Sequence, residues 1–334
     1  MRFVIFGAGA IGGVVGAKLH QSGHDVALIA RGAHCEAIRE RGLTLEQPHA
    51  AAAQLRIPVA DAPEALVWSG DDVVILATKS QDTAGALEAL RPAVPTTTPV
   101  VCLQNGVENE RAALRLFPNV YGAVVMSPTA HLEPGIVQAY GTRGTGVIDV
   151  GRYPEGLDAL CEEIAQALGE SDFSSVPRPD IMRYKHAKLL SNLANAVDAM
   201  CESGPAADEV IELAQDEGRA ALTAAGIEFV ADEVNDVVGR WKELDVQPIA
   251  GRERAGSSTR QSLTRGAPTV ETDYLNGEVS LLGRLHRVAT PVNDALCELS
   301  ARHVRERRPP VSLPAGEVLE LARAGSYADG PVRR

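Results

Sequence analysis

The sequence has few cysteines, no long apolar run and a shortage of positive charge, and each shortage excludes a class of protein. The five cysteines are scattered along the chain, and no two form a CxxC pair. We therefore expect no disulfide scaffold and no metal site, but buried thiols in a reduced, cytoplasmic protein. No apolar stretch approaches the ~20 residues of a membrane span. Glycines interrupt the apolar N-terminus too early for a signal sequence.

The net charge limits the kinds of partner that are expected, and the chain length indicates the number of domains. The 334 residues carry 44 acidic and 32 basic side chains, for a formal net charge of −12. A nucleic-acid or membrane partner is not expected, because phosphate-rich surfaces attract clustered positive charge. A small anionic ligand would need a local positive site within this acidic chain. A chain of this length is also expected to form two domains.

The first half of the chain reads as strands that alternate with helices. The apolar run Arg2–Phe6 is followed by a glycine turn at 7–12, a helical pattern to about Ser22 and a second apolar run at Val26–Ile29. Runs that are apolar on both faces suit parallel strands covered by helices on both sides. Further strand candidates are 73–77, 99–103, 120–126 and 147–150. The pattern predicts a doubly wound α/β domain of the Rossmann type.

In the second half of the chain, the spacing of the apolar residues is typical of helices. A proline-rich joint at 175–179 precedes stretches with helical spacing at about 180–201, 206–225 and 272–288. We predict an N-terminal Rossmann domain over 1–177 and an all-helical domain over 178–306. The segment 307–334, rich in Pro, Gly, Ala and Arg, is expected to be a flexible tail with one short helix near 316–324.

The glycine turn predicts a dinucleotide site. In GAGAIG, Gly7 allows the tight turn, Gly9 lets a pyrophosphate approach the backbone, and Gly12 lets helix and strand pack closely. The alternative is a glycine-rich turn without a ligand. NAD-binding proteins place an acid after the second strand, but here Arg31 stands at that point. Guanidinium matches a 2′-phosphate, so NADP(H) is the predicted cofactor, the alternative for Arg31 being a solvated loop residue.

A polar stripe marks the first helical stretch of the second domain. Lys188, Asn192 and Asn195 lie at about 0°, +40° and −20° around a helix axis. Asparagines on such an apolar helix need polar partners or a ligand. A lysine beside them would be partly desolvated, which lowers its pKa and makes it a proton donor near neutrality. The alternative is a solvated helix face. Glu271 begins a later helix-like run, where it could cap the helix or pair with a lysine.

These motifs together resemble the ketopantoate reductase (2-dehydropantoate 2-reductase) family over residues 1–305. The resemblance implies an NADP-binding Rossmann domain, a helical domain like that of 6-phosphogluconate dehydrogenase, and an active site between them. The motifs that carry it, in the family's order, are GAGAIGG at 7–13, Ala77-Thr78-Lys79, Gln104-Asn105-Gly106, Lys188-Leu189-Leu190-Ser191-Asn192, Ser257-Ser258, and Glu271 to Gly277.

The resemblance also implies roles for individual residues. Lys188 would be the general acid that protonates the ketone oxygen, and Glu271 would act beside it. Lys79 and Asn105 would lie at the nicotinamide end. Asn105, Asn192, Asn195 and Ser258 would contact the substrate. The full set expected at the cofactor is Gly7, Ala8, Gly9, Ala10, Ile11, Gly12, Arg31, Lys79 and Asn105.

Two departures from the family pattern concern the substrate side. The second helix asparagine of the family would fall at Ala196, whereas this chain has Asn195. One extra residue before Glu271 leaves Ser257, Ser258 and Thr259 as alternatives for the substrate carboxylate. The predicted function is NADPH-dependent reduction of ketopantoate to pantoate, a step of pantothenate biosynthesis.

Two alternatives to that function remain. One is a paralogous reductase of another 2-oxo acid or ketone, and the other is a non-catalytic NADP(H)-binding redox sensor. The expected partner is a small 2-oxo acid, and a homodimer is the assembly common in the wider superfamily.

Overall fold

The computed structural model describes residues 1–252 and 256–326. Contacts divide the chain into two compact units. The first holds Met1–Lys185 with the described part of 230–254, and the second holds His186–Phe229 with the described part of 255–334. Helix α6 (Ile181–Asn192) runs from the first unit into the second.

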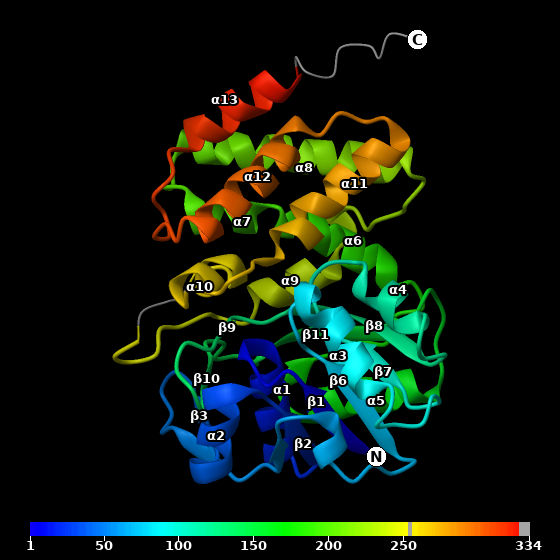
Figure 1. Ribbon diagram of the computed structural model, residues 1–334. Coiled ribbons are helices and arrows are strands. Elements are labelled where there is room, and N and C mark those ends of the chain that lie inside the picture. Colours follow the sequence, from blue (N-terminus) through cyan, green and yellow to red (C-terminus); the bar gives the residue numbers. More distant parts are fainter. Residues whose placement is uncertain (253–255, 327–334) are drawn as a thin grey trace. The chain divides into compact units, whose positions relative to one another are not determined.

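An eight-stranded sheet forms the centre of the first unit (Figure 1). Its order is β12-β11-β8-β7-β6-β1-β2-β5, and every neighbouring pair is parallel except β8 with β11. The predicted Rossmann-type sheet is therefore confirmed. The strands are β1 (Arg2–Phe6), β2 (Asp25–Ile29), β5 (Val59–Ala60), β6 (Asp72–Leu76), β7 (Val100–Cys102), β8 (Val120–Met126), β11 (Gly146–Arg152) and β12 (Phe173–Ser174).

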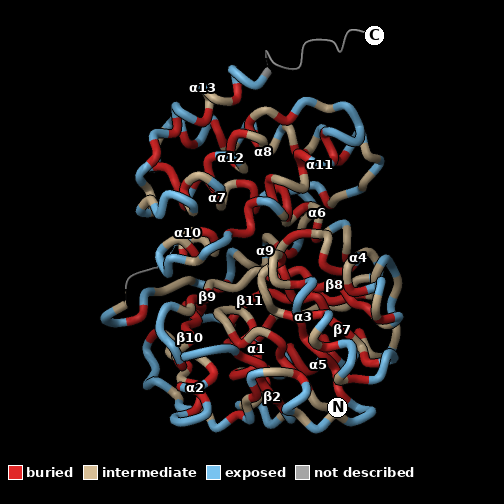
Figure 2. Tube along the Cα trace, viewed as in Figure 1, coloured by how far each residue is buried: buried red, intermediate tan, exposed pale blue. Residues whose placement is uncertain are grey.

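Both faces of this sheet are covered, which explains the continuous apolar runs. Phe3 and Ile5 of β1 pack in one core with α1 (Ala10–Gln21) and α5 (Ala159–Glu170). Val4 and Phe6 pack in another core with α3 (Thr83–Leu90) and α4 (Asn109–Leu114). Successive residues of a strand point to opposite faces, so each strand must be apolar throughout. The central strands are accordingly buried along their length (Figure 2).

A second, four-stranded sheet was not anticipated from the sequence. Its order is β4-β3-β10-β9. Leu43, Leu45 and Val137 from this sheet share the core of α1, so α1 is buried by both sheets. The strands are β3 (Leu43–Glu46), β4 (Ala53–Leu55), β9 (Thr129–Ala130) and β10 (Ile136–Ala139). The first unit also contains α2 (Gly32–Arg41), η1 (Pro63–Ala65), η2 (Ser80–Asp82), η3 (Asp232–Val234) and α9 (Asp236–Lys242).

The second unit is helical, as predicted, and has its own apolar core. The single helix expected over about 180–201 is instead two helices, because α6 ends at Asn192 and α7 begins at Ala194. After α6, the helices are α7 (Ala194–Met200), α8 (Pro205–Ala224), α10 (Ser258–Thr264), η4 (Glu271–Tyr274), α11 (Asn276–His286), α12 (Pro291–Arg305) and α13 (Ala315–Ser326).

The units differ from the expected domain limits. The first unit does not end at Pro177, which bridges to Val150 of the first sheet. The first unit continues to Lys185, and the chain returns to it after Phe229.

The segment expected to be a flexible tail contains α13, whose Val318 is fully buried against the second core. The rest of that expected tail, 327–334, lies outside the described residues.

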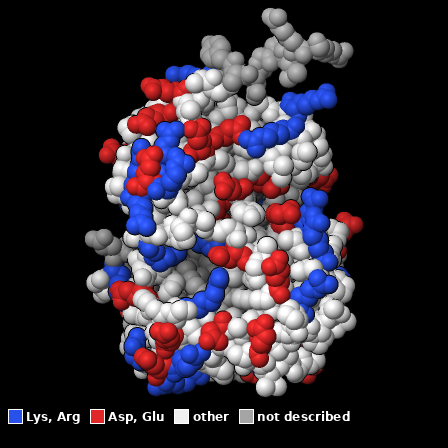
Figure 3. Space-filling model, in the orientation of Figure 1, with Lys and Arg blue, Asp and Glu red and all other residues white. Residues whose placement is uncertain are grey.

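The surface shown in Figure 3 mixes acidic and basic side chains. Among the described residues, no helix is both long enough and apolar enough to cross a membrane.

Candidate active site

The predicted cofactor residues follow the carboxyl ends of four neighbouring strands of the first unit. β2, β1, β6 and β7 lie side by side and parallel. Their carboxyl ends lead, in that order, to Arg31, the 7–12 glycine turn, Lys79 and Asn105. Open parallel sheets bind ligands beyond these ends, where the strand order reverses. The order reverses here at β1, between β2 and β6.

The glycines of the turn meet three different steric demands. Gly7 has φ +105°, and a Cβ there would lie 2.9 Å from the Ala77 carbonyl carbon. A Cβ on Gly12 would lie 2.2 Å from the Gly7 carbonyl oxygen. A Cβ on Gly9 would meet nothing within 4 Å. Gly7 and Gly12 are therefore required by the fold, whereas the open side of Gly9 suits a group that approaches the backbone.

The helix after the turn fits an anionic group. Gly9 is the N-cap of α1 and supplies no side-chain cap. The first turn of this 12-residue helix contains no acidic residue. Its free N–H groups and positive dipole end therefore match the pyrophosphate of a dinucleotide.

His34 supports the turn and was missed by sequence reasoning. Its Nε2 lies 2.7 Å from the Ala8 carbonyl oxygen, and its Nδ1 lies 2.9 Å from the Gly135 nitrogen. Nε2 must donate to the carbonyl, so Nδ1 is the acceptor and the ring is neutral. Burial and the neighbouring His131 lower the pKa of His34 to about 4. Its partner Gly135 is 101 positions away, so no local pattern marks this role.

Arg31 lies at the surface, where a phosphate could reach it. It is the N-cap of α2, and its side chain is 70% exposed. Its guanidinium is 3.6 Å from a carboxylate oxygen of Asp82. Such an exposed pair is weak, so Asp82 would steady Arg31 without blocking a stronger doubly charged partner.

The loops that carry Lys79 and Asn105 are hydrogen-bonded to each other. Gln104 Nε2 donates to the Thr78 carbonyl oxygen at 2.8 Å. The Ser80 hydroxyl donates to the Asn105 carbonyl oxygen at 3.2 Å. Lys79 lies between the two bonded residues and is half-buried. The structure therefore brings these two predicted residues into one loop cluster.

Lys188 has the character predicted for a proton donor. It is half-buried on α6, and burial lowers its pKa to about 8. Among the described residues, no carboxylate forms an ion pair with its ammonium group. Without such a partner, nothing offsets the cost of desolvating the charge, and the proton is easier to release.

The break in the helix changes the predicted asparagine stripe. Asn192 is the last residue of α6 and is 4% exposed, whereas half-buried Asn195 lies in the first turn of α7. The angle expected for Asn195 assumed one continuous helix, and it stays a prediction across Leu193, whose dihedrals are φ −60° and ψ −25°. The Asn195 carbonyl accepts from the Ser257 hydroxyl at 3.3 Å, which joins α7 to the start of α10.

The three candidates for the substrate carboxylate differ in their surroundings. Ser257 is the N-cap of α10, and its hydroxyl accepts from the Arg260 amide at 3.2 Å. Ser258 is half-buried. Thr259 is buried, and its hydroxyl has no hydrogen-bond partner among the residues the structure describes.

Glu271 and Asn276 lie on one buried segment of the second unit. Glu271 begins η4 and is 4% exposed. Asn276 Nδ2 donates to the Leu193 carbonyl oxygen at 3.3 Å and to Asn293 Oδ1 at 3.0 Å. Asn276 therefore satisfies a backbone group at the break between α6 and α7. The sequence contains no proline or glycine at that break, so the break could not be predicted locally.

Asn293 continues this buried network. Asn293 Nδ2 donates to Glu217 at 2.7 Å, and Glu217 also accepts from the backbone amides of Val292 and Asn293. Glu217 thereby caps the N-terminus of α12.

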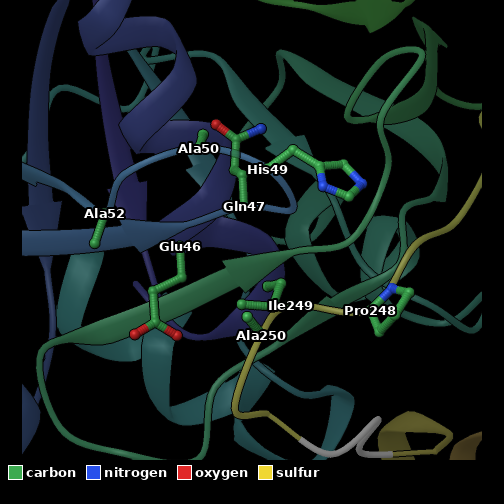
Figure 4. A pocket seen from close by; sticks show the side chains of 8 residues that line it. All are labelled: Glu46, Gln47, His49, Ala50, Ala52, Pro248, Ile249 and Ala250. Carbon is green, nitrogen blue, oxygen red and sulfur yellow. The ribbon is translucent and has the colours of Figure 1, made fainter.

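A cavity of about 510 Å³ elsewhere in the first unit includes none of the predicted residues. The hairpin after β3 and a returning segment form it, and Figure 4 shows its lining side chains. Glu46 in its wall is paired with Arg252 at 2.7 Å. Within residues 1–252 and 256–326, no three His, Cys, Asp or Glu side chains are grouped to hold a metal ion.

Comparisons with known families cover both units. The model described as ketopantoate reductase PanE/ApbA matches residues 3–155, and its C-terminal counterpart matches residues 180–303. The 2-dehydropantoate 2-reductase of Mesorhizobium japonicum is 32% identical over 92% of this chain and 99% of its own length. That of Pyrococcus horikoshii is 31% identical over 90% of this chain and 96% of its own length.

Solved structures agree with these matches. A PanE/ApbA family ketopantoate reductase from Ralstonia eutropha JMP134 is 29% identical, with a TM-score of 0.77, and covers 92% of this chain and 100% of its own. D-mandelate dehydrogenase, solved with NADH and anilino(oxo)acetate, is 25% identical, with a TM-score of 0.78, and covers 92% and 99%. With both family models matched and relatives above 30% identity over nearly the whole length, the chain belongs to the ketopantoate reductase family.

Proposed function

We propose that this protein uses NADPH to reduce the ketone of a 2-oxo acid, with ketopantoate as substrate and pantoate as product. The observation that carries the proposal is the half-buried Lys188, whose pKa of about 8 suits a general acid, in a chain that matches the family over both units. The choice of ketopantoate as substrate rests on the curated relatives, which are named 2-dehydropantoate 2-reductase.

The glycine turn with Arg31, Lys79 and Asn105 would hold the cofactor. When bound, NADPH supplies the hydride that adds to the carbonyl carbon. The N-terminus of α1 would bind the pyrophosphate and Arg31 the 2′-phosphate. The amide of Asn105 and the ammonium of Lys79 would contact the nicotinamide end, where their loops are joined by hydrogen bonds.

Lys188 would supply the proton that completes the reduction. As the hydride adds to carbon, negative charge develops on the ketone oxygen, and a positioned ammonium group stabilises it. The ammonium then transfers one proton to that oxygen, leaving a hydroxyl group and a neutral lysine. Glu271 would act beside this lysine, and water would restore its proton after each turnover.

The substrate would be oriented by side chains of the second unit. Asn192 and Asn195 would contact the end of the substrate distant from the carboxylate. Ser258 is our choice for the carboxylate, and Thr259 is the alternative. Ser257 is less suited, because its hydroxyl already caps α10 and donates to Asn195.

A second candidate is reduction of a 2-oxo acid with an aromatic side chain. The likeness to D-mandelate dehydrogenase favours it, because oxidised mandelate is phenylglyoxylate, an aromatic 2-oxo acid. The position of Asn195 differs from the family pattern on the substrate side, where such a change would act. That neighbour was solved with NADH, so NADH is also the alternative cofactor.

Initial rates with a panel of 2-oxo acids test both candidates. NADPH oxidation would be followed with ketopantoate, 2-oxoisovalerate and phenylglyoxylate, and repeated with NADH. We expect kcat/KM for ketopantoate with NADPH to be the highest. A preference for phenylglyoxylate would favour the second candidate. Tight NADPH binding without turnover of any 2-oxo acid would contradict both and favour a redox sensor.

A further inference from the structure

A buried ion pair lies beneath the loop that carries Asn105. Lys185 Nζ is 2.5 Å from Glu110 Oε1, and their side chains are 2% and 0% exposed. Burial of two charges is costly, and similar apolar residues often stabilise a fold as well. Stability alone therefore does not explain why this core holds an ion pair.

Lys185 also binds the backbone of the loop directly. Its Nζ lies 2.8 Å from the Gln104 carbonyl oxygen and 3.3 Å from the Ala123 carbonyl oxygen. The ammonium therefore uses its three hydrogens on one carboxylate and two carbonyls. The Gln104 carbonyl belongs to the peptide bond between Gln104 and Asn105. Lys185 therefore holds the peptide bond on the N-terminal side of Asn105.

Glu110 lies at the other end of the same loop. It lies in the first turn of α4, next to Asn109. Asn109 Nδ2 donates to the Asn105 carbonyl oxygen at 2.9 Å. The peptide bonds on both sides of Asn105 are thus anchored, one by Lys185 and the other by Asn109, the chain neighbour of Glu110.

Strand β8 lies beside the pair at Gly122. A Cβ on Gly122 of β8 would lie 3.5 Å from both Glu110 Oε1 and Lys185 Cδ. Burial raises the pKa of the nearby Cys102 thiol, and the negative charge of Glu110 adds to this effect. Burial likewise raises the pKa of the Glu110 carboxyl, and the charge of Lys185 acts against that rise.

We propose that Lys185 and Glu110 are positioning residues that fix the amide of Asn105 for the nicotinamide end of the cofactor. This inference rests on the proposed function for the role of Asn105. A pair that only stabilises the fold could be replaced by apolar residues without a kinetic effect. A pair that positions Asn105 could not.

The test replaces both charged residues with apolar ones and asks whether the resulting change in kcat and in the Kd for NADPH depends on Asn105. The K185M/E110L variant removes the pair, N105A removes the amide, and the triple variant combines them. Melting temperature, the Kd for NADPH and kcat are measured for each. We expect K185M/E110L to melt near the wild type yet lose about tenfold to a hundredfold in kcat, the scale of a misplaced contact. In the N105A background, the same replacement should change kcat and Kd less than about twofold.

A matched control uses another ion pair of the same sheet. Arg2 and Asp72 pair at 2.7 Å where β1 and β6 begin, at the edge opposite Asn105. The R2M/D72L variant should leave kcat and the Kd for NADPH within about twofold of the wild type. If K185M/E110L fails to fold, E110Q keeps the shape of the side chain and should show the same dependence on Asn105.

The outcomes separate this inference from the proposed function. Normal kinetics in K185M/E110L, or losses that simply add to those of N105A, would overturn the positioning role. A wild-type enzyme that binds NADPH but does not reduce ketopantoate would overturn the proposed substrate. In that case, dependence on Asn105 measured through the Kd for NADPH would still support the positioning role.

Discussion

The depressed pKa of Lys188 predicts how the rate of reduction changes with pH. The side chain must be protonated to act as a general acid, and its pKa is about 8 rather than 10.5. About nine-tenths of the enzyme would be protonated at pH 7 and about one-tenth at pH 9. We therefore expect log kcat to be level below pH 7 and to fall with a slope near −1 above pH 8, which makes a tenfold loss between pH 7 and pH 9.

The assay is the initial rate of NADPH oxidation at saturating 2-oxo acid between pH 6 and pH 10. The Kd for NADPH over the same range is the control, because binding of the cofactor does not require the proton of Lys188. K188A should lower kcat by about 10²–10⁴-fold and change the Kd for NADPH by less than about twofold. A level profile beyond pH 9, or turnover that survives K188A, would refute the assignment of the acid.

The same pKa shift makes an independent prediction about stability. Below pH 8 both folded and unfolded chains carry the proton, and the folded chain pays the full cost of burying the charge, about 3 kcal/mol. Between pH 8 and pH 10.5 the unfolded chain binds more protons, so this cost declines as pH rises. K188M should therefore unfold at a higher urea concentration than the wild type at pH 7, and this advantage should vanish by pH 10.5. An equal or lower midpoint at pH 7 would show that the lysine is not desolvated.

Three further predictions concern the remaining parts of the site. R31A should raise the Kd for NADPH by at least tenfold and leave that for NADH nearly unchanged, as measured by titration of cofactor fluorescence; an equal loss for both would contradict a 2′-phosphate contact. G12A should lower the melting temperature sharply, because its Cβ would lie 2.2 Å from a carbonyl oxygen, whereas G9A should melt like the wild type and bind NADPH more weakly. N276L should raise KM for the 2-oxo acid several-fold and leave the Kd for NADPH unchanged, since Asn276 supports the helix break between Asn192 and Asn195; unchanged substrate kinetics would argue against that support.

Local chemistry let much of the first unit be predicted from sequence. A glycine is needed at 7 because φ is positive there, and at 12 because helix and strand pack too closely for a Cβ. These demands depend on residues close in the chain, so they leave a readable motif. The buried strands are equally readable, because cover on both faces requires a continuous apolar run.

The helical unit was predictable in content and less so in detail. The period of its apolar residues indicates helices but carries no information on a break that a distant side chain stabilises. Leu193 marks such a break, and Asn276, which bonds its carbonyl, is 83 positions away. The single helix predicted over 180–201 was therefore wrong, and the angle of Asn195 on it stays a prediction.

The sequence by itself determined the strand–turn–helix start, the helical second half and the residues that resemble the family. Tertiary structure alone decided where the residues of the first unit meet, because strand order and long-range pairing bring distant segments to the same ends of its parallel strands. It joined the loops of Lys79 and Asn105, placed His34 against the glycine turn and buried Lys185 on Glu110, 75 positions earlier in the chain. Each of these contacts depends on desolvation and on hydrogen bonds across the fold, and neither is encoded in local spacing.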